Sequence, residues 1–421
     1  MSNIDFLNIS CTSIDEAREK TTELLEQRQP NYSLAQGLYN DPALFRVDME
    51  EIFQKEWLFV GMSSEIPKKG DYFTVEIGQN PVLILRDGEG KISAFHNTCR
   101  HRGSRLCSKE RGKVANLVCP YHQWTYDLKG NLLFAGSETN PGFDMKQHGL
   151  KRAHCKTAGG FIFVCLAESA PVSDFDDFLL TLEEYMEPYD VENTKLAVES
   201  NMYERANWKL VIENNRECYH CAGSHPELLN SLLEWDDIND PRAPQSFLDY
   251  YNKHAAQWDE QGIPHRHRSF GLRNRIVRMP LKEGAKVMTI DGGTGSGKLL
   301  GRFTSYFQGS MRILHLPNSW NHMQSDHFIV FRVLPISAQE TMVTTKWFVH
   351  KDAVEGVDYD PQRLREVWDA TNDQDRVLGE ENQRGINSMG YRPGPYSESH
   401  EFGVINFIDW YSDIVLKNLH P

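Results

Sequence analysis

The stretch Cys99-Arg-His-Arg-Gly103, followed by Cys119-Pro-Tyr-His122, decides the fold of the N-terminal part of the chain. Each half supplies one cysteine and one histidine, and seventeen residues separate His101 from Cys119. Short stretches that alternate apolar and polar residues precede it, and glycine, asparagine and proline separate them. The pattern predicts a small all-β module that carries both motifs on loops, with strands at 71–77, 81–86 and 91–95.

Together the two motifs offer two thiolates and two imidazoles. In a Rieske [2Fe–2S] centre two histidines replace two cysteines on one iron, so this donor set matches that cluster. A structural zinc site is the rival, but zinc fingers usually pair cysteine with cysteine and histidine with histidine. We therefore predict that the cluster is held by Cys99, His101, Cys119 and His122.

A second metal-binding pattern lies near the middle of the chain. If this segment is helical, Glu213, Glu217 and His220 lie on one face. Gly223-Ser-His-Pro226 then breaks the helix and can turn His225 toward His220. Two histidines and a distant carboxylate form the ligand set of non-heme Fe(II) oxygenases. Taken alone, the segment is equally compatible with an amphipathic helix that has two buried, hydrogen-bonded histidines.

The third iron ligand must come from elsewhere in the chain. Alternating apolar and polar residues predict an antiparallel sheet with one open face, from strands at 311–316, 327–334 and 342–350. A helix predicted over 360–387 can lie across that sheet, and Asp375 within it is a candidate ligand. Spacing alone leaves three alternatives open, namely Asp369, Asp373 and Glu380.

The composition limits the partners and the compartment. The 421 residues carry a formal net charge of −14, which argues against binding to nucleic acid or to anionic membranes. No apolar run approaches the roughly 18 residues of a membrane span, and the first residues lack a secretion signal. We expect a cytoplasmic protein. In that reducing compartment the cysteines outside the two motifs should be free thiols: Cys11, Cys107, Cys155, Cys165, Cys218 and Cys221.

A linker-like composition at 167–174 marks a domain boundary. We predict an α+β protein in three parts. A helical segment at 1–43 packs on the catalytic domain, and an all-β Rieske [2Fe–2S] domain occupies 44–168. The catalytic domain at 169–421 combines an antiparallel sheet with helices in a helix-grip-like arrangement and holds the mononuclear iron.

With both patterns present, the chain resembles the oxygenase (α) component of Rieske non-heme iron oxygenases, nearly from end to end. Within that family it is most similar to the branch that acts on quaternary ammonium compounds. The segments that carry the resemblance lie at 51–57, 118–126, 213–221, 371–375 and 393–397.

The resemblance implies roles for two carboxylates. In this family the third iron ligand precedes a short apolar stretch and a glutamate, which here selects Asp375. It also implies that Glu217 bridges a Rieske histidine of one subunit to an iron-binding histidine of the next, in a head-to-tail homotrimer. Many aromatic-ring dioxygenases of the family have aspartate at that point, whereas the betaine and carnitine branch has glutamate. Since no flavin or nicotinamide motif is visible, a separate NAD(P)H-dependent reductase of the flavin or ferredoxin type should supply electrons.

The resemblance further implies that O₂ is used to oxidise an N-methyl group of glycine betaine, giving dimethylglycine and formaldehyde. Proline betaine and carnitine are alternative substrates, and an aromatic-ring dioxygenase or a non-catalytic Rieske electron carrier are alternatives of other classes. An aromatic cage would bind the trimethylammonium group through cation–π attraction. The candidates for that cage are Trp235, Phe270, Trp320, Tyr391 and Trp410, and those for binding a substrate carboxylate are Asn207 and His315.

Overall fold

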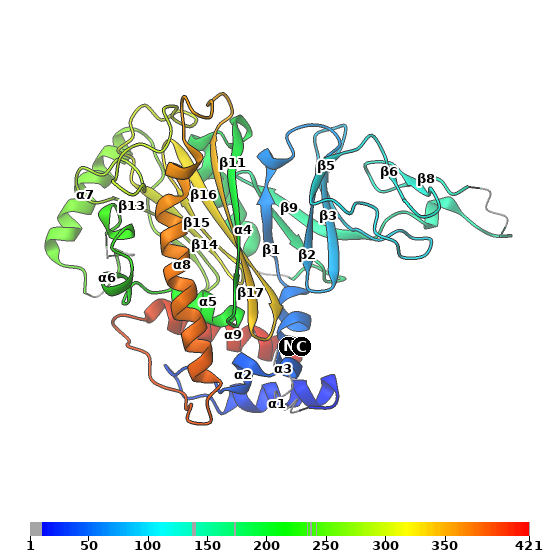
Figure 1. Ribbon diagram of the computed structural model, residues 1–421, viewed down its shortest axis with the longest axis horizontal. Coiled ribbons are helices and arrows are strands. Elements are labelled where there is room, and N and C mark those ends of the chain that lie inside the picture. The colour runs from blue at the N-terminus through cyan, green and yellow to red at the C-terminus, as the bar shows by residue number, and fades with distance from the viewer. Residues whose placement is uncertain are drawn as a thin grey trace. The chain divides into compact units, whose positions relative to one another are not determined.

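The computed structural model describes residues 11–136, 140–171, 174–233, 235, 238–240 and 242–420. The chain forms two compact units (Figure 1). One consists of residues 53–172, and the other combines residues 1–52 with residues 173–421. The second unit is therefore discontinuous in sequence, because the first is inserted into it.

The unit of residues 53–172 is built on a seven-stranded antiparallel sheet with the order β1-β10-β9-β4-β3-β2-β5. A three-stranded sheet, β6-β7-β8, accompanies it. Strands β1 and β10 consist almost entirely of large apolar residues and are buried along their whole length. The strands are β1 (Leu58–Met62), β2 (Asp71–Ile77), β3 (Asn80–Arg86), β4 (Ile92–His96), β5 (Arg111–Lys113), β6 (Leu117–Val118), β7 (Thr125–Tyr126), β8 (Leu132–Phe134), β9 (Arg152–Ala158) and β10 (Phe161–Cys165).

The two Cys/His motifs lie on connections of this unit. The first follows β4, and the second joins β6 to β7. The three strands predicted from the sequence correspond to β2, β3 and β4 within one residue at each end. A core that includes Phe95, Trp124 and Tyr126 packs against both cysteines and supports the two loops.

The larger unit contains a second seven-stranded sheet, with the order β11-β17-β16-β15-β14-β13-β12 and antiparallel pairing throughout. This is the antiparallel sheet that the alternating pattern predicted. Its strands are β11 (Thr194–Glu204), β12 (Arg268–Phe270), β13 (Asn274–Met279), β14 (Ser310–His315), β15 (Ser319–Met323), β16 (His327–Ser337) and β17 (Glu340–His350).

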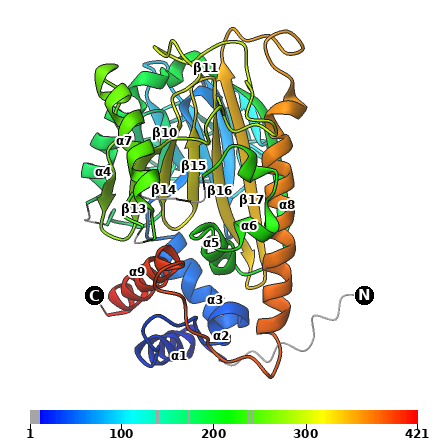
Figure 2. The same ribbon diagram turned by 90° about the vertical axis from the view of Figure 1, so that its left-hand side faces the viewer.

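Helices cover this sheet and one of its ends. Helix α8 runs along the sheet, while α1, α2, α3 and α9 gather at one end of the unit (Figure 2). Asp360 caps α8 by accepting from the N–H of Gln362, and proline occupies its first turn. The helices are α1 (Ile14–Glu26), α2 (Gly37–Asn40), α3 (Pro42–Asp48), α4 (Phe175–Met186), α5 (Trp208–Asn215), α6 (Cys221–Ser224), α7 (Gln245–Glu260), α8 (Pro361–Ile386) and α9 (Phe402–Leu419).

The buried side chain of Asp48 ties the N-terminal segment to the rest of the larger unit. Its carboxylate pairs with Lys209 and accepts hydrogen bonds from Trp208 Nε1 at 3.0 Å and from the Tyr411 hydroxyl at 2.8 Å. A buried charge is stable only with such partners. Residues 44–52, which the sequence analysis assigned to the iron–sulfur domain, therefore belong to the larger unit.

The polar stretch after Trp235 also contains a folded element. Helix α7 buries Phe247, Tyr251 and Trp258, so this region contributes core residues as well as surface. Within the described ranges, no helix is both long and apolar enough to cross a membrane.

Candidate functional site

The two Cys/His loops share one backbone geometry. The N–H of Gly103 donates to the carbonyl of Cys99 at 3.0 Å, and that of Gln123 donates to the carbonyl of Cys119 at 3.1 Å. In both loops the cysteine N–H donates to the carbonyl five residues later, at 2.8 Å. Gly103 and Gln123 have φ of +80° and +64°, a conformation that glycine adopts freely and glutamine only at a cost. The two loops therefore hold their cysteine and histidine side chains on the same backbone conformation.

The side chains of these loops divide into buried thiols and exposed imidazoles. Cys99 and Cys119 are each 2% exposed, whereas His101 and His122 are exposed, with ring centroids 4.6 Å apart. Burial raises the pKa of the Cys99 thiol, so a thiolate there needs a cation to stabilise it. Two enclosed thiols beside two neighbouring imidazoles fit the donor set of a Rieske cluster.

The segment predicted as one continuous helix is divided by a turn between α5 and α6. Glu217 lies in this turn, where its carboxylate accepts from the N–H groups of Tyr219 and His220. Because the side chain takes donors that a continuing helix would use, it favours the turn over the helix. The predicted common face of Glu213, Glu217 and His220 is therefore wrong.

Glu213 points into a different environment. Its carboxylate is partly buried and accepts from the hydroxyls of Tyr39 at 2.8 Å and Tyr396 at 2.9 Å. Burial raises the pKa of Glu213 to about 7 despite these hydrogen bonds. Glu213 thus packs with tyrosines from the N-terminal segment and from the stretch before α9.

Three candidate iron ligands meet at one point, although Asp375 comes 150 residues after His225. The Nε2 atoms of His220 and His225 lie 3.0 Å apart, and Asp375 Oδ1 lies 3.3 Å and 2.9 Å from them. Despite these short distances, Asp375 Oδ1 makes no well-oriented hydrogen bond within the described part of the chain. Two imidazole nitrogens and a carboxylate oxygen that converge on one point in this way fit the coordination shell of a divalent metal such as Fe(II).

The outer nitrogen of each imidazole has an acceptor. His220 Nδ1 lies 2.5 Å from Glu217 Oε1, and His225 Nδ1 lies 2.8 Å from Gln374 Oε1, whose amide donates to Glu227 at 2.9 Å. Proton donation from Nδ1 leaves the Nε2 lone pair available to a metal. Gln374 was not predicted, although its position next to Asp375 on α8 was the available signal.

The charges of the three groups depend on one another. Burial opposes the imidazolium form, but Asp375 and Glu217 outweigh it and raise the pKa of His220 to about 9. Burial likewise opposes the charge on Asp375, but the two adjacent histidines, His220 and His225, hold its pKa below the usual value. The arrangement therefore stabilises positive charge at its centre, which a divalent cation would also provide.

The three alternative carboxylates on α8 face other partners. Asp369 pairs with Arg365 at 2.5 Å, while Asp373 and Glu380 pair with Arg376 at 2.6 Å and 3.4 Å. The structure therefore brings Asp375, and none of these three, to the two histidines.

Two cysteines beside the histidines differ from expectation. Cys218 and Cys221 form a disulfide, so the prediction that both are free thiols is wrong. The spacing of three residues in a turn brings the two sulfur atoms within bonding reach. The cysteines at the other four non-motif positions are in the reduced form: Cys11, Cys107, Cys155 and Cys165.

A cavity opens beside the three candidate ligands. Besides the two candidate ligand histidines, its aromatic lining consists of Trp320, His322 and Trp368. Of the five predicted cage residues, all of which are described, Trp320 is the one that lines it. Trp368 was missed, although it lies seven residues before Asp375 and so on the same face of α8.

The other candidate substrate residues lie elsewhere. Trp235 lies under Arg242, Phe270 packs on Phe178, the Tyr391 hydroxyl donates to Leu34, and Trp410 stacks on Phe407. Asn207 caps α5, and His315 is hydrogen-bonded to Asn274 at 2.7 Å. These side chains have structural partners, and they do not appear among the described residues that line the cavity.

Comparisons with known proteins identify both units. The family model of the Rieske [2Fe-2S] domain matches residues 56–140, and that of the ring hydroxylating alpha subunit (catalytic domain) matches residues 188–417. The glycine betaine monooxygenase oxygenase subunit of Pseudomonas aeruginosa is 65% identical over 96% of this chain and 94% of its own length. That of Chromohalobacter salexigens is 59% identical over 96% and 90%.

A solved structure shares the fold. The quaternary ammonium Rieske monooxygenase CntA in complex with L-carnitine superposes with a TM-score of 0.68 at 22% identity, over 93% of this chain and 98% of that one. The α+β fold with an N-terminal Rieske domain and a sheet-and-helix catalytic domain is thereby confirmed. The resemblance inferred from the sequence is confirmed as well: the chain belongs to the family of Rieske oxygenase α subunits.

Proposed function

We propose that this protein is the oxygenase component of a glycine betaine monooxygenase. It uses O₂ and electrons from a separate NAD(P)H-dependent reductase to hydroxylate one N-methyl group. The observation that carries the proposal is the 65% identity over almost the full length of an oxygenase subunit with that activity in its name. By contrast, the large subunit of anthranilate 1,2-dioxygenase from Acinetobacter baylyi is 32% identical over 52% of this chain.

The chemistry of the substrate requires an oxygenase. A quaternary nitrogen has no lone pair, so oxidation cannot begin by removing an electron from nitrogen, and a C–H bond must be attacked instead. Insertion of one oxygen atom gives an N–CH₂OH group, and two electrons and two protons reduce the other oxygen atom to water. The C–N bond then breaks, which releases formaldehyde and dimethylglycine.

The site residues take the following roles in this proposal. The [2Fe–2S] cluster is held by Cys99, His101, Cys119 and His122, and the mononuclear iron by His220, His225 and Asp375. When bound, the iron supplies the activation of O₂ for C–H hydroxylation. Glu217 and Gln374 each hold the Nδ1 proton of one histidine, which fixes the ring orientation and keeps Nε2 directed at the metal position.

The cavity wall accounts for recognition of a quaternary ammonium group. Trp320 and Trp368 are 7% and 5% exposed and belong to one group of packed rings, in which Phe331 lies 5.1 Å and 5.0 Å from them. A trimethylammonium group beside such faces gains cation–π attraction of roughly 0.5–2 kcal/mol per contact. Enclosure by these rings also excludes water, which strengthens that attraction.

The proposal includes a head-to-tail homotrimer, in which Glu217 bridges a Rieske histidine of one subunit to His220 of the next. Within one chain, Glu217 already binds His220 through Oε1. We expect Glu217→Ala to leave both metal centres loaded at saturating iron, while turnover falls by at least 100-fold because electron delivery is broken. Full activity of this variant would exclude the bridging role, and sedimentation analysis would test the trimer.

Oxygen uptake and formaldehyde release test the function directly. The holoenzyme is combined with a reductase and supplied with glycine betaine, proline betaine or carnitine in turn. We expect one formaldehyde per O₂, with the highest kcat/KM for glycine betaine. A higher kcat/KM for proline betaine or carnitine would show that glycine betaine is not the preferred substrate. Formation of a diol from an aromatic ring would show that the enzyme is a dioxygenase. Reduction of the cluster without O₂ uptake would show that the protein is an electron carrier.

A further inference from the structure

The disulfide between Cys218 and Cys221 lies in the turn that carries a candidate iron ligand. It joins the two residues on either side of Tyr219 and His220, with a Cα–Cα distance of 4.9 Å. The N–H of Cys221 donates to the carbonyl of Cys218 at 3.2 Å, which closes the same turn through the backbone. Both cysteines line the iron-site cavity. A bond that can be reduced therefore lies beside the metal position.

The sulfur of Cys221 is close to both candidate iron-binding histidines. A ring nitrogen of His220, a ring nitrogen of His225 and Cys221 Sγ all lie within 4.8 Å of one another. The bond to Cys218 fixes the rotamer of Cys221, so its sulfur cannot turn toward the metal position. When the bond is broken, Cys221 can adopt its other staggered rotamers, which move Sγ relative to the two imidazoles. Reduction therefore frees a sulfur donor beside the site.

A fourth protein ligand would change what the site can do. Two imidazoles and the Asp375 carboxylate leave positions open for O₂. A thiolate added to them gives four protein ligands, the number found in closed structural zinc sites, whereas catalytic sites keep one position open. Thiolate is also a softer ligand than imidazole or carboxylate, and it favours zinc over Fe(II). The sulfur atoms of a disulfide are not thiolates, so the oxidised pair does not offer this ligand.

The two cysteines differ in their access to solvent. Cys218 is half-buried and precedes the exposed Tyr219, whereas Cys221 is 4% exposed. Since thiol–disulfide exchange depends on which sulfur can be reached, a dithiol attacks Cys218 and releases the Cys221 thiol. The second thiol of the reductant then releases Cys218. In total the S–S bond takes up two electrons and two protons, and the dithiol becomes a disulfide.

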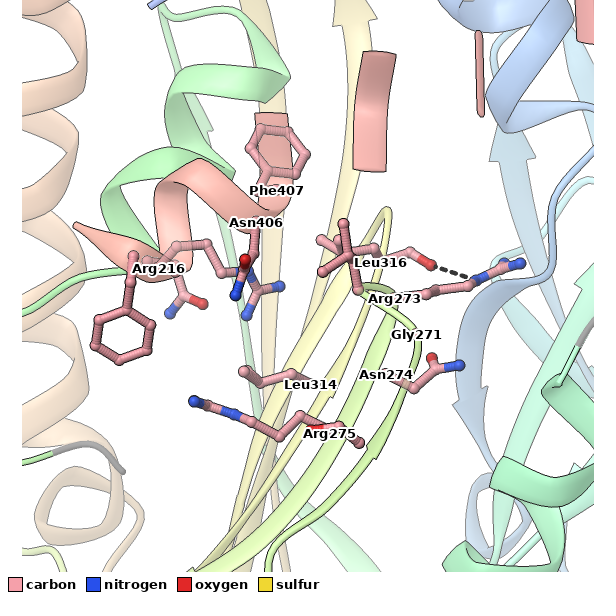
Figure 3. A pocket seen from close by; sticks show the side chains of 14 residues that line it. Arg216, Gly271, Arg273, Asn274, Arg275, Leu314, Leu316, Asn406 and Phe407 are labelled. Atoms are coloured by element: carbon pink, nitrogen blue, oxygen red, sulfur yellow. Dashed lines mark hydrogen bonds between the residues drawn. The ribbon is translucent and has the colours of Figure 1, made fainter. Parts of the chain in front are cut away.

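A second cavity offers a small dithiol an approach to this bond. Asn215 and Leu314 line both the second cavity and the iron-site cavity. Gly271, in the exposed turn between β12 and β13, lines the second cavity as well (Figure 3). The second cavity therefore extends from the protein surface to the wall of the iron-site cavity.

We propose that Cys218 and Cys221 form a redox site that controls the metal position. In the oxidised form the disulfide holds the Cys221 sulfur away from the metal, and the site stays open for O₂. In the reduced form Cys221 becomes a fourth protein ligand beside His220, His225 and Asp375, which closes the site and favours zinc. The proposal rests on the proposed function for its effect on turnover, whereas the change of ligand can be measured without a substrate.

Zinc-edge X-ray absorption tests the change of ligand. The mononuclear iron of the holoenzyme is replaced by zinc, and the cluster is left in place and checked by its visible spectrum. In the oxidised protein we expect nitrogen and oxygen neighbours and no sulfur. After reduction with dithiothreitol and removal of the reagent without air, we expect one sulfur neighbour at about 2.3 Å. Zinc affinity, measured by chelator competition, should rise by roughly tenfold or more, because thiolate favours zinc.

Serine substitutions separate the two cysteines. Cys218→Ser leaves the Cys221 thiol free, so zinc should have a sulfur neighbour without reduction. Cys221→Ser should show no sulfur neighbour in either state. Cys155→Ser, which removes a thiol of the smaller unit, is the control and should behave as the wild type does. Alkylation followed by mass spectrometry should find Cys218 and Cys221 of the wild type reactive only after reduction.

Turnover measures the consequence for the proposed function. With iron in the site, reduction should lower formaldehyde release from glycine betaine by roughly tenfold or more, because a closed site has no position for O₂. Diamide, which takes one hydrogen atom from each of the two thiols and restores the S–S bond, should restore the rate. Cys221→Ser should release formaldehyde at the same rate before and after reduction.

Several outcomes would overturn the inference. One is a zinc spectrum without sulfur in both the reduced wild type and Cys218→Ser, and another is a sulfur neighbour that remains in Cys221→Ser. Alkylation of Cys218 and Cys221 without prior reduction would show that the bond is absent. Equal turnover in both redox states would show that the sulfur does not control the site, while leaving the proposed function intact.

Failure of the proposed function has a different signature. If no betaine is converted in either redox state, the proposed function fails, and the zinc spectra alone decide the change of ligand. If Cys218→Ser does not fold, the reduced wild type decides, because it carries the same free Cys221 thiol without a substitution.

Discussion

The two candidate metal sites are built in opposite ways. The cluster site draws all its donors from two loops of matching backbone geometry within residues 99–122, on one small β unit. The mononuclear site joins a turn near the middle of the chain to Asp375 on α8. The first depends on local turns, whereas the second exists only when α8 is packed against the segment that follows α5. The two sites should therefore respond differently to substitutions.

The strongest test of that contrast is Asp375→Asn. The amide removes the anionic ligand, so we expect the mononuclear site to lose its iron and formaldehyde release to become undetectable. The visible spectrum of the cluster should stay unchanged, because its donors belong to another unit. Metal analysis and spectroscopy measure both. The control is Asp373→Asn, an exposed residue of the same helix that pairs with Arg376, and equal iron loss there would contradict the assignment.

A smaller effect is expected at Gln374, which accepts from His225 Nδ1 at 2.8 Å. Partners of metal-binding histidines typically contribute 10- to 100-fold in metal affinity. Gln374→Ala should therefore weaken iron binding about tenfold, measured by chelator competition, and excess iron should restore turnover. Unchanged affinity would show that the orientation of His225 is set by packing alone.

The corresponding contact at the cluster is the Tyr126 hydroxyl, 3.4 Å from Cys99 Sγ. Hydrogen bonds to cluster sulfurs stabilise the extra electron of the reduced state. Loss of this one in Tyr126→Phe should lower the reduction potential by about 50 mV, the equivalent of roughly one net hydrogen bond. Potentiometric titration measures the shift, and the iron content of the mononuclear site should not change. A reduction potential equal to that of the wild type would show that the Tyr126 hydroxyl does not stabilise the reduced cluster.

The smallest expected effect concerns stability near the mononuclear site. Burial, together with the charges of Asp375 and Glu380, raises the pKa of Glu204 from 4.5 to about 8. The unfolded chain releases this proton near pH 4.5, so the free energy of unfolding decreases as the pH rises from about 4.5 to 8. Glu204→Gln should remove that slope and stabilise the protein by roughly 1–3 kcal/mol at pH 8.

Denaturant titrations at pH 5 and pH 8, at equal metal content, measure the slope. Glu199→Gln, on the same strand and half-exposed, is the control. If Glu204→Gln keeps the wild-type dependence of the free energy of unfolding on pH, a group other than Glu204 binds the proton.

The contrast between the two sites also explains what the sequence could reveal. Cys99, His101, Cys119 and His122 were identifiable because their spacing alone encodes a recognisable donor set. Asp375 could be separated from Asp369, Asp373 and Glu380 only through the resemblance to a family, because the choice depends on how α8 is rotated against the sheet. The same dependence on packing hid Trp368 and Gln374.

The errors have a common physical origin. The predicted face of Glu213, Glu217 and His220 assumed an unbroken helix, but the carboxylate of Glu217 captures the N–H groups of the following turn. All five cage aromatics were chosen by residue type, and the structure uses four of them for packing. The sheet, in contrast, was predictable from alternation, which reports directly which face is buried.

The insertion of one unit into the other has a consequence for synthesis on the ribosome. The β unit of residues 53–172 is continuous, and it can fold soon after its last strand emerges. The first 52 residues must wait much longer, because the partners of Asp48 include Lys209 and finally Tyr411. The nascent chain therefore carries an unpaired aspartate and an exposed apolar helical segment until Tyr411 has been synthesised. The segment around Asp48 is thus made before the β unit but reaches its final position after it.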